Sequence, residues 1–161
     1  MAKGQAETLM PLIEDVLAEA GVDWPALTAI GVGVGPGNFT GIRISVSAAR
    51  GLAMGLGIPA IGVNRFDAIA LDGPKLPVVV PAIRSQVWVQ SPGEAPYASE
   101  TQPNPALGGG DGLIAPVHPL AVAIAQIALA RLGTDQPRPA PLYLREADAA
   151  PPSEAPPALI E

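Results

Sequence analysis

A short apolar segment, a glycine-rich loop, a long apolar helix pattern and a second apolar segment follow one another between residues 29 and 63. Residues 29–34 are apolar on both faces of an extended strand, which is typical of a parallel sheet covered on both sides. A parallel partner, predicted at residues 58–63, requires a crossover connection, and the helical pattern of residues 40–55 supplies it. The sequence therefore predicts an α/β fold built on a right-handed strand–helix–strand unit.

Proline divides the chain into two parts of different character. Five of the 20 prolines precede Leu76 and fifteen follow it. Because proline fixes φ and removes a backbone donor, we expect shorter elements and more loop in the second part. We predict an N-terminal α/β lobe at residues 1–75, a smaller C-terminal α/β lobe at residues 76–148 and a disordered proline-rich tail at residues 149–161.

The remaining elements are predicted from hydrophobic periodicity and from glycine and proline punctuation. They are helices at residues 6–20, 65–71 and 119–131, hairpin strands at residues 76–81 and 86–90, a loop at residues 91–105 and a short closing segment at residues 142–145. The helix of residues 40–55 is apolar on more than one side, which indicates that more than one of its sides is buried.

Charge and composition argue against several classes of function. The chain has 15 acidic and 9 basic residues and a net charge of −6, which disfavours gripping nucleic-acid backbones through a basic patch. It has no Cys, which excludes disulfides and thiolate chemistry, and its single His excludes a His-rich metal site. No apolar run reaches the roughly 18 residues of a membrane span, and no secretory signal opens the chain. We expect a cytoplasmic protein without metal, cofactor or membrane contact.

The glycine-rich loop before the predicted helix of residues 40–55 has two interpretations. Its backbone N–H groups, with the helix N-terminus, are able to bind an anion. However, no Lys follows the last glycine as in a Walker A motif, and the spacing after Gly33 and Gly35 reaches Asn38 where a dinucleotide fingerprint has glycine. The chemistry favours the alternative, a tight turn around Pro36 with Asn38 or Thr40 capping the helix.

Other polar residues are interpreted as structural or solvated. Arg43 and Arg50 lie seven residues apart on one helix face, where pairing with acids or with solvent is the expected outcome. His118 has no neighbouring Ser or Cys nucleophile and is expected to be structural.

The loop and its continuation resemble a known signature. The segment GPGNFTGIR, followed by GIP at residues 57–59 and GV at residues 62–63, is similar to the GPGSFTGxR and GIPxxGV patterns of the TsaB (YeaZ) family of bacterial tRNA threonylcarbamoyladenosine biosynthesis proteins. The closing segment PLYLR at residues 141–145 is similar to the family's PxYLR. The motif loop comprises Gly35, Pro36, Gly37, Asn38, Phe39, Thr40, Gly41 and Arg43. The resemblance implies an actin-like ATPase/sugar-kinase type fold with ribonuclease H-like lobes.

Three departures from the family pattern stand out. Asn38 replaces the usual Ser, and both residues cap helices. Ala82 stands where the family usually has Asp in a DARR-type turn. The family's N-terminal strands, which carry an IDTS-like motif, are expected to be missing, and this leaves the strand at residues 29–34 with an unpaired edge.

The resemblance implies a partner function. TsaB-like proteins act as non-catalytic dimerisation or scaffold subunits that support a TsaD-like catalytic subunit, which transfers threonylcarbamoyl to adenosine of tRNA, together with a TsaE-like ATPase. No direct tRNA binding is expected, and a homodimer would use the same two helices. The interface residues predicted from the helices of residues 7–20 and 40–55 are Leu9, Leu12, Val16, Ile42, Val46 and Ala49.

Two other hypotheses remain open. The first is a stand-alone ATP-binding or peptidase-like enzyme. The lone His118 speaks against a metallopeptidase, and the missing N-terminal strands speak against an ATP user. The second is a non-functional truncated product.

Overall fold

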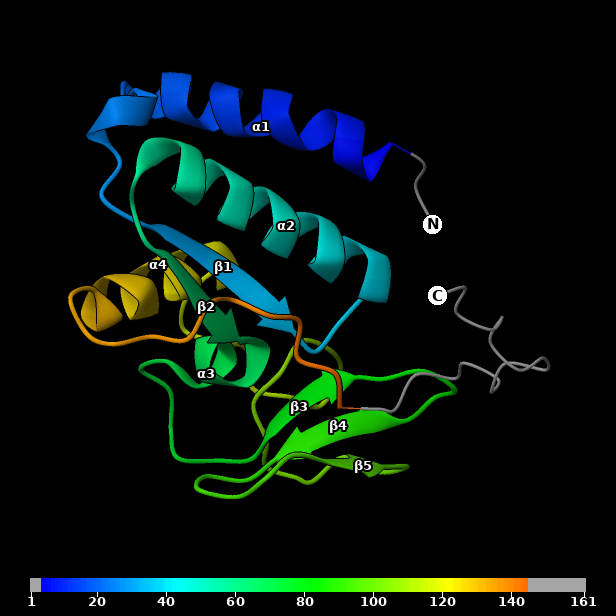
Figure 1. The fold of residues 1–161 in the computed structure, drawn as a ribbon. Coiled ribbons are helices and arrows are strands. Elements are labelled where there is room, and N and C mark those ends of the chain that lie inside the picture. Colours follow the sequence, from blue (N-terminus) through cyan, green and yellow to red (C-terminus); the bar gives the residue numbers. More distant parts are fainter. Residues whose placement is uncertain (1–3, 145–161) are drawn as a thin grey trace, which may run out of the picture.

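The computed structural model describes residues 4–144 and contains two small sheets that lie in different parts of the chain (Figure 1). The helices are α1 (Gln5–Ala20), α2 (Phe39–Leu56), α3 (Arg65–Ala70) and α4 (Leu120–Arg131), with a 3-10 turn, η1, at Trp24–Ala26. The strands are β1 (Ile30–Gly35), β2 (Ala60–Asn64), β3 (Val78–Pro81), β4 (Val87–Gln90) and β5 (Tyr97–Ser99).

The predicted strand–helix–strand unit is confirmed. β1 and β2 pair in parallel, with Val32 opposite Gly62, and α2 connects them. Within the described residues, β1 pairs with no other strand. α2 covers one face of this sheet, where Val32 packs with Val46 and Ala49. α1 lies along α2 on the side away from the sheet (Figure 1).

The opposite face of the parallel sheet is covered by α4, which approaches β1 closely. A Cβ atom placed on Gly31 would lie 2.9 Å from the Cβ of Ala128 and 3.3 Å from the carbonyl oxygen of Ile124. Only glycine, which has no Cβ atom, allows the β1 backbone and α4 to approach each other this closely. Buried Ile61 and Val63 of β2 complete this core beneath the helix.

Local signals set the ends of the long helices. Asn38 accepts a hydrogen bond from the Gly41 N–H at 2.8 Å and caps the start of α2. Gly21 ends α1 and Gly57 ends α2, both in the left-handed conformation that glycine adopts without a Cβ clash. These caps explain why the observed boundaries lie within one residue of the predicted ones.

The second sheet is antiparallel, in the order β3–β4–β5, and confirms the predicted hairpin. Val79, Val80 and Val89 are buried in it. β5 falls inside the segment predicted as a loop, and this prediction is wrong for three residues. Tyr97 and Ala98 are exposed, so the strand carries no alternating burial pattern that a sequence reading can detect.

The two predicted lobes share elements. α4 belongs by sequence to residues 76–148, yet it packs on β1, β2 and α3. The closing segment also contacts the first predicted lobe, since the Leu142 N–H donates a hydrogen bond to the carbonyl of Val34 in β1 at 2.7 Å. The predicted tail at residues 149–161 and the last residues of the predicted second lobe lie outside the described residues. No helix within residues 4–144 is both long and apolar enough to cross a membrane.

Candidate functional site

The outward side of α1 and α2 carries large apolar side chains that the chain itself does not cover. Leu12 is 59% exposed, Val16 is 56% exposed and Met54 is 84% exposed. The two helices run side by side in the same direction (Figure 1). Val16 and Met54 are each close to the C-terminal end of their helix, and they therefore lie towards the same end of the helix pair. We call these three residues the outer helix surface. Isolated exposed hydrophobics are common, but a group on adjoining helices is typical of an interaction surface.

The structure corrects part of the predicted interface. Val46 is 3% exposed and Ala49 is 6% exposed, and both pack against Val32 of β1 together with half-buried Ile42. These positions face the chain's own sheet, so a partner on the outer helix surface does not reach Val46 or Ala49. Helical periodicity located two apolar sides on α2 but could not tell which side meets the sheet.

Charged residues occupy other exposed positions of the same two helices. The exposed side of α1 bears four acidic residues, and the exposed side of α2 bears Arg43 and Arg50. The acidic residues are Glu7, Glu14, Asp15 and Glu19. None of the six takes part in an ion pair that the structure records within residues 4–144. An apolar centre with a charged rim is the usual composition of a protein–protein contact.

The glycine-rich loop adopts a tight turn. The Gly35–Pro36 peptide bond is cis, and Gly35 has a φ of 104°, which a residue with a side chain rarely adopts. A Cβ atom on Gly35 would lie 2.8 Å from Cδ1 of Ile42. With Asn38 capping α2, these features confirm the interpretation of the loop as a turn and a cap.

Arg43 of the motif holds the closing segment in place. Its guanidinium lies 3.8 Å from the centre of the Phe39 ring and 5.6 Å from that of Tyr143. Its Nε donates to the Tyr143 hydroxyl at 2.7 Å, and the two rings are 5.2 Å apart. Cation–π contacts of this kind fix the side chain without neutralising its charge. Arg43 therefore contacts aromatic rings, whereas pairing with acids or with solvent was expected.

A groove opens between the motif loop, the β3–β4 hairpin and the closing segment. It has a volume of about 1050 Å³. Arg43 and Arg65 line it, and no Asp or Glu among the described residues does. The Nε atom of Arg65 is buried and has no hydrogen-bond partner within residues 4–144. The sequence analysis did not identify Arg65 or the groove. The walls of the groove come from segments far apart in the chain, and no local pattern predicts that these segments meet.

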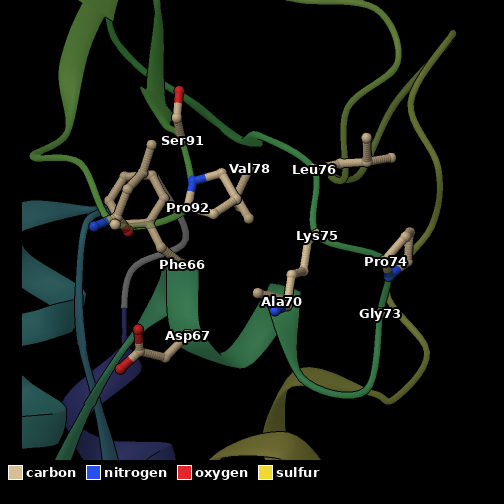
Figure 2. A pocket seen from close by; sticks show the side chains of 12 residues that line it. Phe66, Asp67, Ala70, Gly73, Pro74, Lys75, Leu76, Val78, Ser91 and Pro92 are labelled. Carbon is tan, nitrogen blue, oxygen red and sulfur yellow. The ribbon is translucent and has the colours of Figure 1, made fainter.

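A second, smaller hollow lies beside α3 (Figure 2). Its volume is about 220 Å³, and its walls include Phe66, Val78 and Pro92. The carboxylate of Asp67 accepts a hydrogen bond from Arg131 at 2.8 Å, so its charge is already paired. Its polar lining residues are Asp67, Lys75, Gln90 and Ser91, and within residues 4–144 the structure records no side-chain hydrogen bond or ion pair among these four.

His118 has a structural contact. Its Nε2 lies 2.8 Å from Oδ2 of Asp72, next to the start of α4, and no nucleophile is recorded in contact with it. Over residues 4–144, no group of three or more His, Cys, Asp and Glu side chains is arranged to hold a metal ion.

Comparison with known proteins gives a consistent set of relatives. The family model described as TsaD, tRNA N6-adenosine threonylcarbamoyltransferase, matches residues 1–101. An uncharacterized protein of Mycobacterium tuberculosis is 35% identical over 171 residues, covering 93% of this chain and 79% of that protein. The tRNA threonylcarbamoyladenosine biosynthesis protein TsaB of Escherichia coli is 38% identical over 64 residues, covering 40% of this chain and 28% of that protein.

Solved structures show the same fold. YeaZ from Pseudomonas aeruginosa superimposes with a TM-score of 0.66 at 23% identity, covering 89% of this chain and 86% of that one. A second crystal structure, described as similar to peptidase YeaZ from the same organism, gives a TM-score of 0.67 at 25% identity. This likeness confirms the actin-like, ribonuclease H-like fold class expected from the sequence.

Proposed function

Because the chain belongs to the TsaB (YeaZ) family, we propose that it acts in tRNA threonylcarbamoyladenosine biosynthesis as a non-catalytic subunit that binds a TsaD-like partner. Relatives named for this biosynthesis support the role in tRNA modification. The match to a family model named for the transferase supports a partner of related architecture.

The outer helix surface carries the proposal. Met54, Leu12 and Val16 are more than half exposed, although side chains of their size usually stabilise a protein by being buried. α1 itself has no buried residue among those described, so a partner that covers it would supply the core that it lacks within the chain. We place the TsaD-like subunit on this surface, in a helix-to-helix contact.

The rim of the surface favours a partner with complementary charge. The acidic residues of α1 would face basic residues of the partner, while exposed Arg50 of α2 would meet an acidic one. The same surface offers a homodimer contact, which would compete with the TsaD-like subunit for the same side chains. A TsaE-like ATPase would bind the assembled pair.

Size-exclusion chromatography with light scattering tests the partnership. A mixture of this chain with a TsaD protein from a related bacterium is expected to elute as a complex larger than either protein. Met54→Lys should abolish the complex, because an unpaired charge in a contact core is strongly unfavourable. Leu129→Lys is the matched control, because Leu129 is 68% exposed on α4, on the other side of the sheet, and also lies near a helix end.

Two results would contradict the proposal. One is separate elution of the two folded wild-type proteins at all concentrations. The other is equal loss of the complex in both lysine variants, which would place the contact elsewhere. The non-catalytic role is tested by assaying modified tRNA: the chain alone should yield none, and its addition to the TsaD-containing mixture should raise the yield.

A further inference from the structure

Two arginines converge on the groove between the motif loop and the β3–β4 hairpin, and neither has an acidic partner within residues 4–144. Arg65 stands at the start of α3, and its Nη1 would lie 3.8 Å from a Cβ atom on Gly37. Arg43 reaches the same groove from the first turn of α2. The chain therefore concentrates positive charge in one hollow, although its net charge is −6.

The state of the Arg65 side chain is the central observation. Its Nε is shielded from solvent and donates no hydrogen bond to any residue that the structure describes. A guanidinium that is partly removed from water without a counter-charge is unfavourable, and most buried donors in proteins are paired. Arg65 also lines the groove, so an anion bound there would offset the charge of its guanidinium. Arg43 is held by two rings rather than by a carboxylate, so its charge is also available.

Most of the other residues that line the groove are apolar, and some present flat surfaces. They include Trp88 of β4, Pro81, Ile83, Phe39 and the ring of Tyr143. Small-molecule sites commonly combine walls of this kind with a few polar groups that fix one end of the ligand. The volume of about 1050 Å³ accommodates a molecule larger than a bare inorganic ion.

We propose that this groove binds a small organic anion, a carboxylate or phosphate group joined to a flat apolar body. Arg65 and Arg43 bind the anionic group through charge-assisted hydrogen bonds, and the body lies against Trp88 and the neighbouring apolar wall. The site lies outside the outer helix surface and does not depend on the proposed partner, so either proposal stands if the other fails.

The two tryptophans of the chain provide a built-in probe and control for nuclear magnetic resonance. The full ¹⁵N-labelled chain is titrated separately with phenyl phosphate, phenylacetate, inorganic phosphate and phenol. The indole N–H signal of Trp88 should shift saturably with phenyl phosphate or phenylacetate, at a Kd of about 1 mM or lower, while the signal of Trp24 stays in place. The better of these two ligands identifies the anionic group. Phenol and inorganic phosphate, which each lack one half of the ligand, should bind more weakly.

Matched arginine variants test the assignment of residues. Arg65→Gln and Arg43→Gln should each raise the Kd about tenfold or more, as expected for the loss of a charge-assisted bond. Arg50→Gln removes the same charge from an exposed position of α2 outside the groove and should leave the Kd unchanged. Arg43→Gln covers the case in which Arg65→Gln does not fold.

Three results would overturn the inference. They are the absence of a saturable Trp88 shift with either aromatic anion, an equal effect of Arg50→Gln and the groove variants, and tighter binding of phenol than of both anions. The second result would mean that the anions respond to overall charge and not to this site.

Discussion

The orientation of α2 predicts that two apolar residues of the same helix contribute very differently to stability. Val46 is 3% exposed and packs against β1, whereas Met54 is 84% exposed. Val46→Ala removes two methyl groups, a loss of about 1.6 kcal/mol of burial free energy, and the resulting cavity adds about 1 kcal/mol. We expect the free energy of unfolding to fall by about 2–3 kcal/mol for Val46→Ala. For Met54→Ala we expect a change under about 0.5 kcal/mol.

Urea denaturation followed by far-ultraviolet circular dichroism measures both values, on the isolated chain at low protein concentration so that self-association does not contribute. Both substitutions end in alanine on one helix, so helix propensity separates them only by the difference between valine and methionine, about 0.4 kcal/mol in favour of Val46→Ala, which is much smaller than the expected burial effect. Equal losses, or a larger loss for Met54→Ala, would refute the assignment of the inner and outer sides of α2. The proposed partner surface would then have to be withdrawn as well.

Two further substitutions test how the parallel sheet is held. Gly31→Ala should lower the free energy of unfolding by about 1–3 kcal/mol through overpacking against α4. Gly33→Ala should lower it less, because a Cβ atom there would lie 3.2 Å from the flexible Cδ1 end of Ile124. A larger loss for Gly33→Ala in the same urea titration would contradict the close approach of α4. Asn38→Ala should lower the unfolding free energy by about 1 kcal/mol through loss of the α2 cap. Asn38→Asp, which keeps the acceptor, should retain most of it, and equal losses in the two variants would show that the cap contributes nothing.

Sequence reasoning located the regular elements well where local signals are strong. The helix expected at residues 40–55 spans Phe39–Leu56, because Asn38 caps its start and Gly57 stops it. The parallel pairing of the first two strands followed from the single helix between them. β5 escaped prediction because its stability comes from pairing with β4 and not from a buried face of its own.

In the candidate site, too, the features set by neighbouring residues were predictable and those set by distant contacts were not. The signature of the motif loop is local, and its turn and cap were readable from glycine, proline and asparagine. The contact of Arg43 with Tyr143 joins residues one hundred positions apart, and no spacing rule reaches that far. The sequence does not distinguish Arg65 from other arginines at strand–helix junctions. Its distinguishing property is that its Nε is buried without a hydrogen-bond partner among the described residues, and this depends on the tertiary packing around it.

By itself, the sequence determined the order of the elements, the caps and turns that bound them and the family to which the chain belongs, because these depend on neighbouring residues and short motifs. Only the tertiary structure decided which side of α2 is buried, that α4 returns to cover β1 and that two arginines share a groove to which no acidic residue among residues 4–144 contributes. Hydrophobic periodicity states that a helix has an apolar side. Whether that side meets its own sheet or remains free for a partner depends on how distant segments pack together.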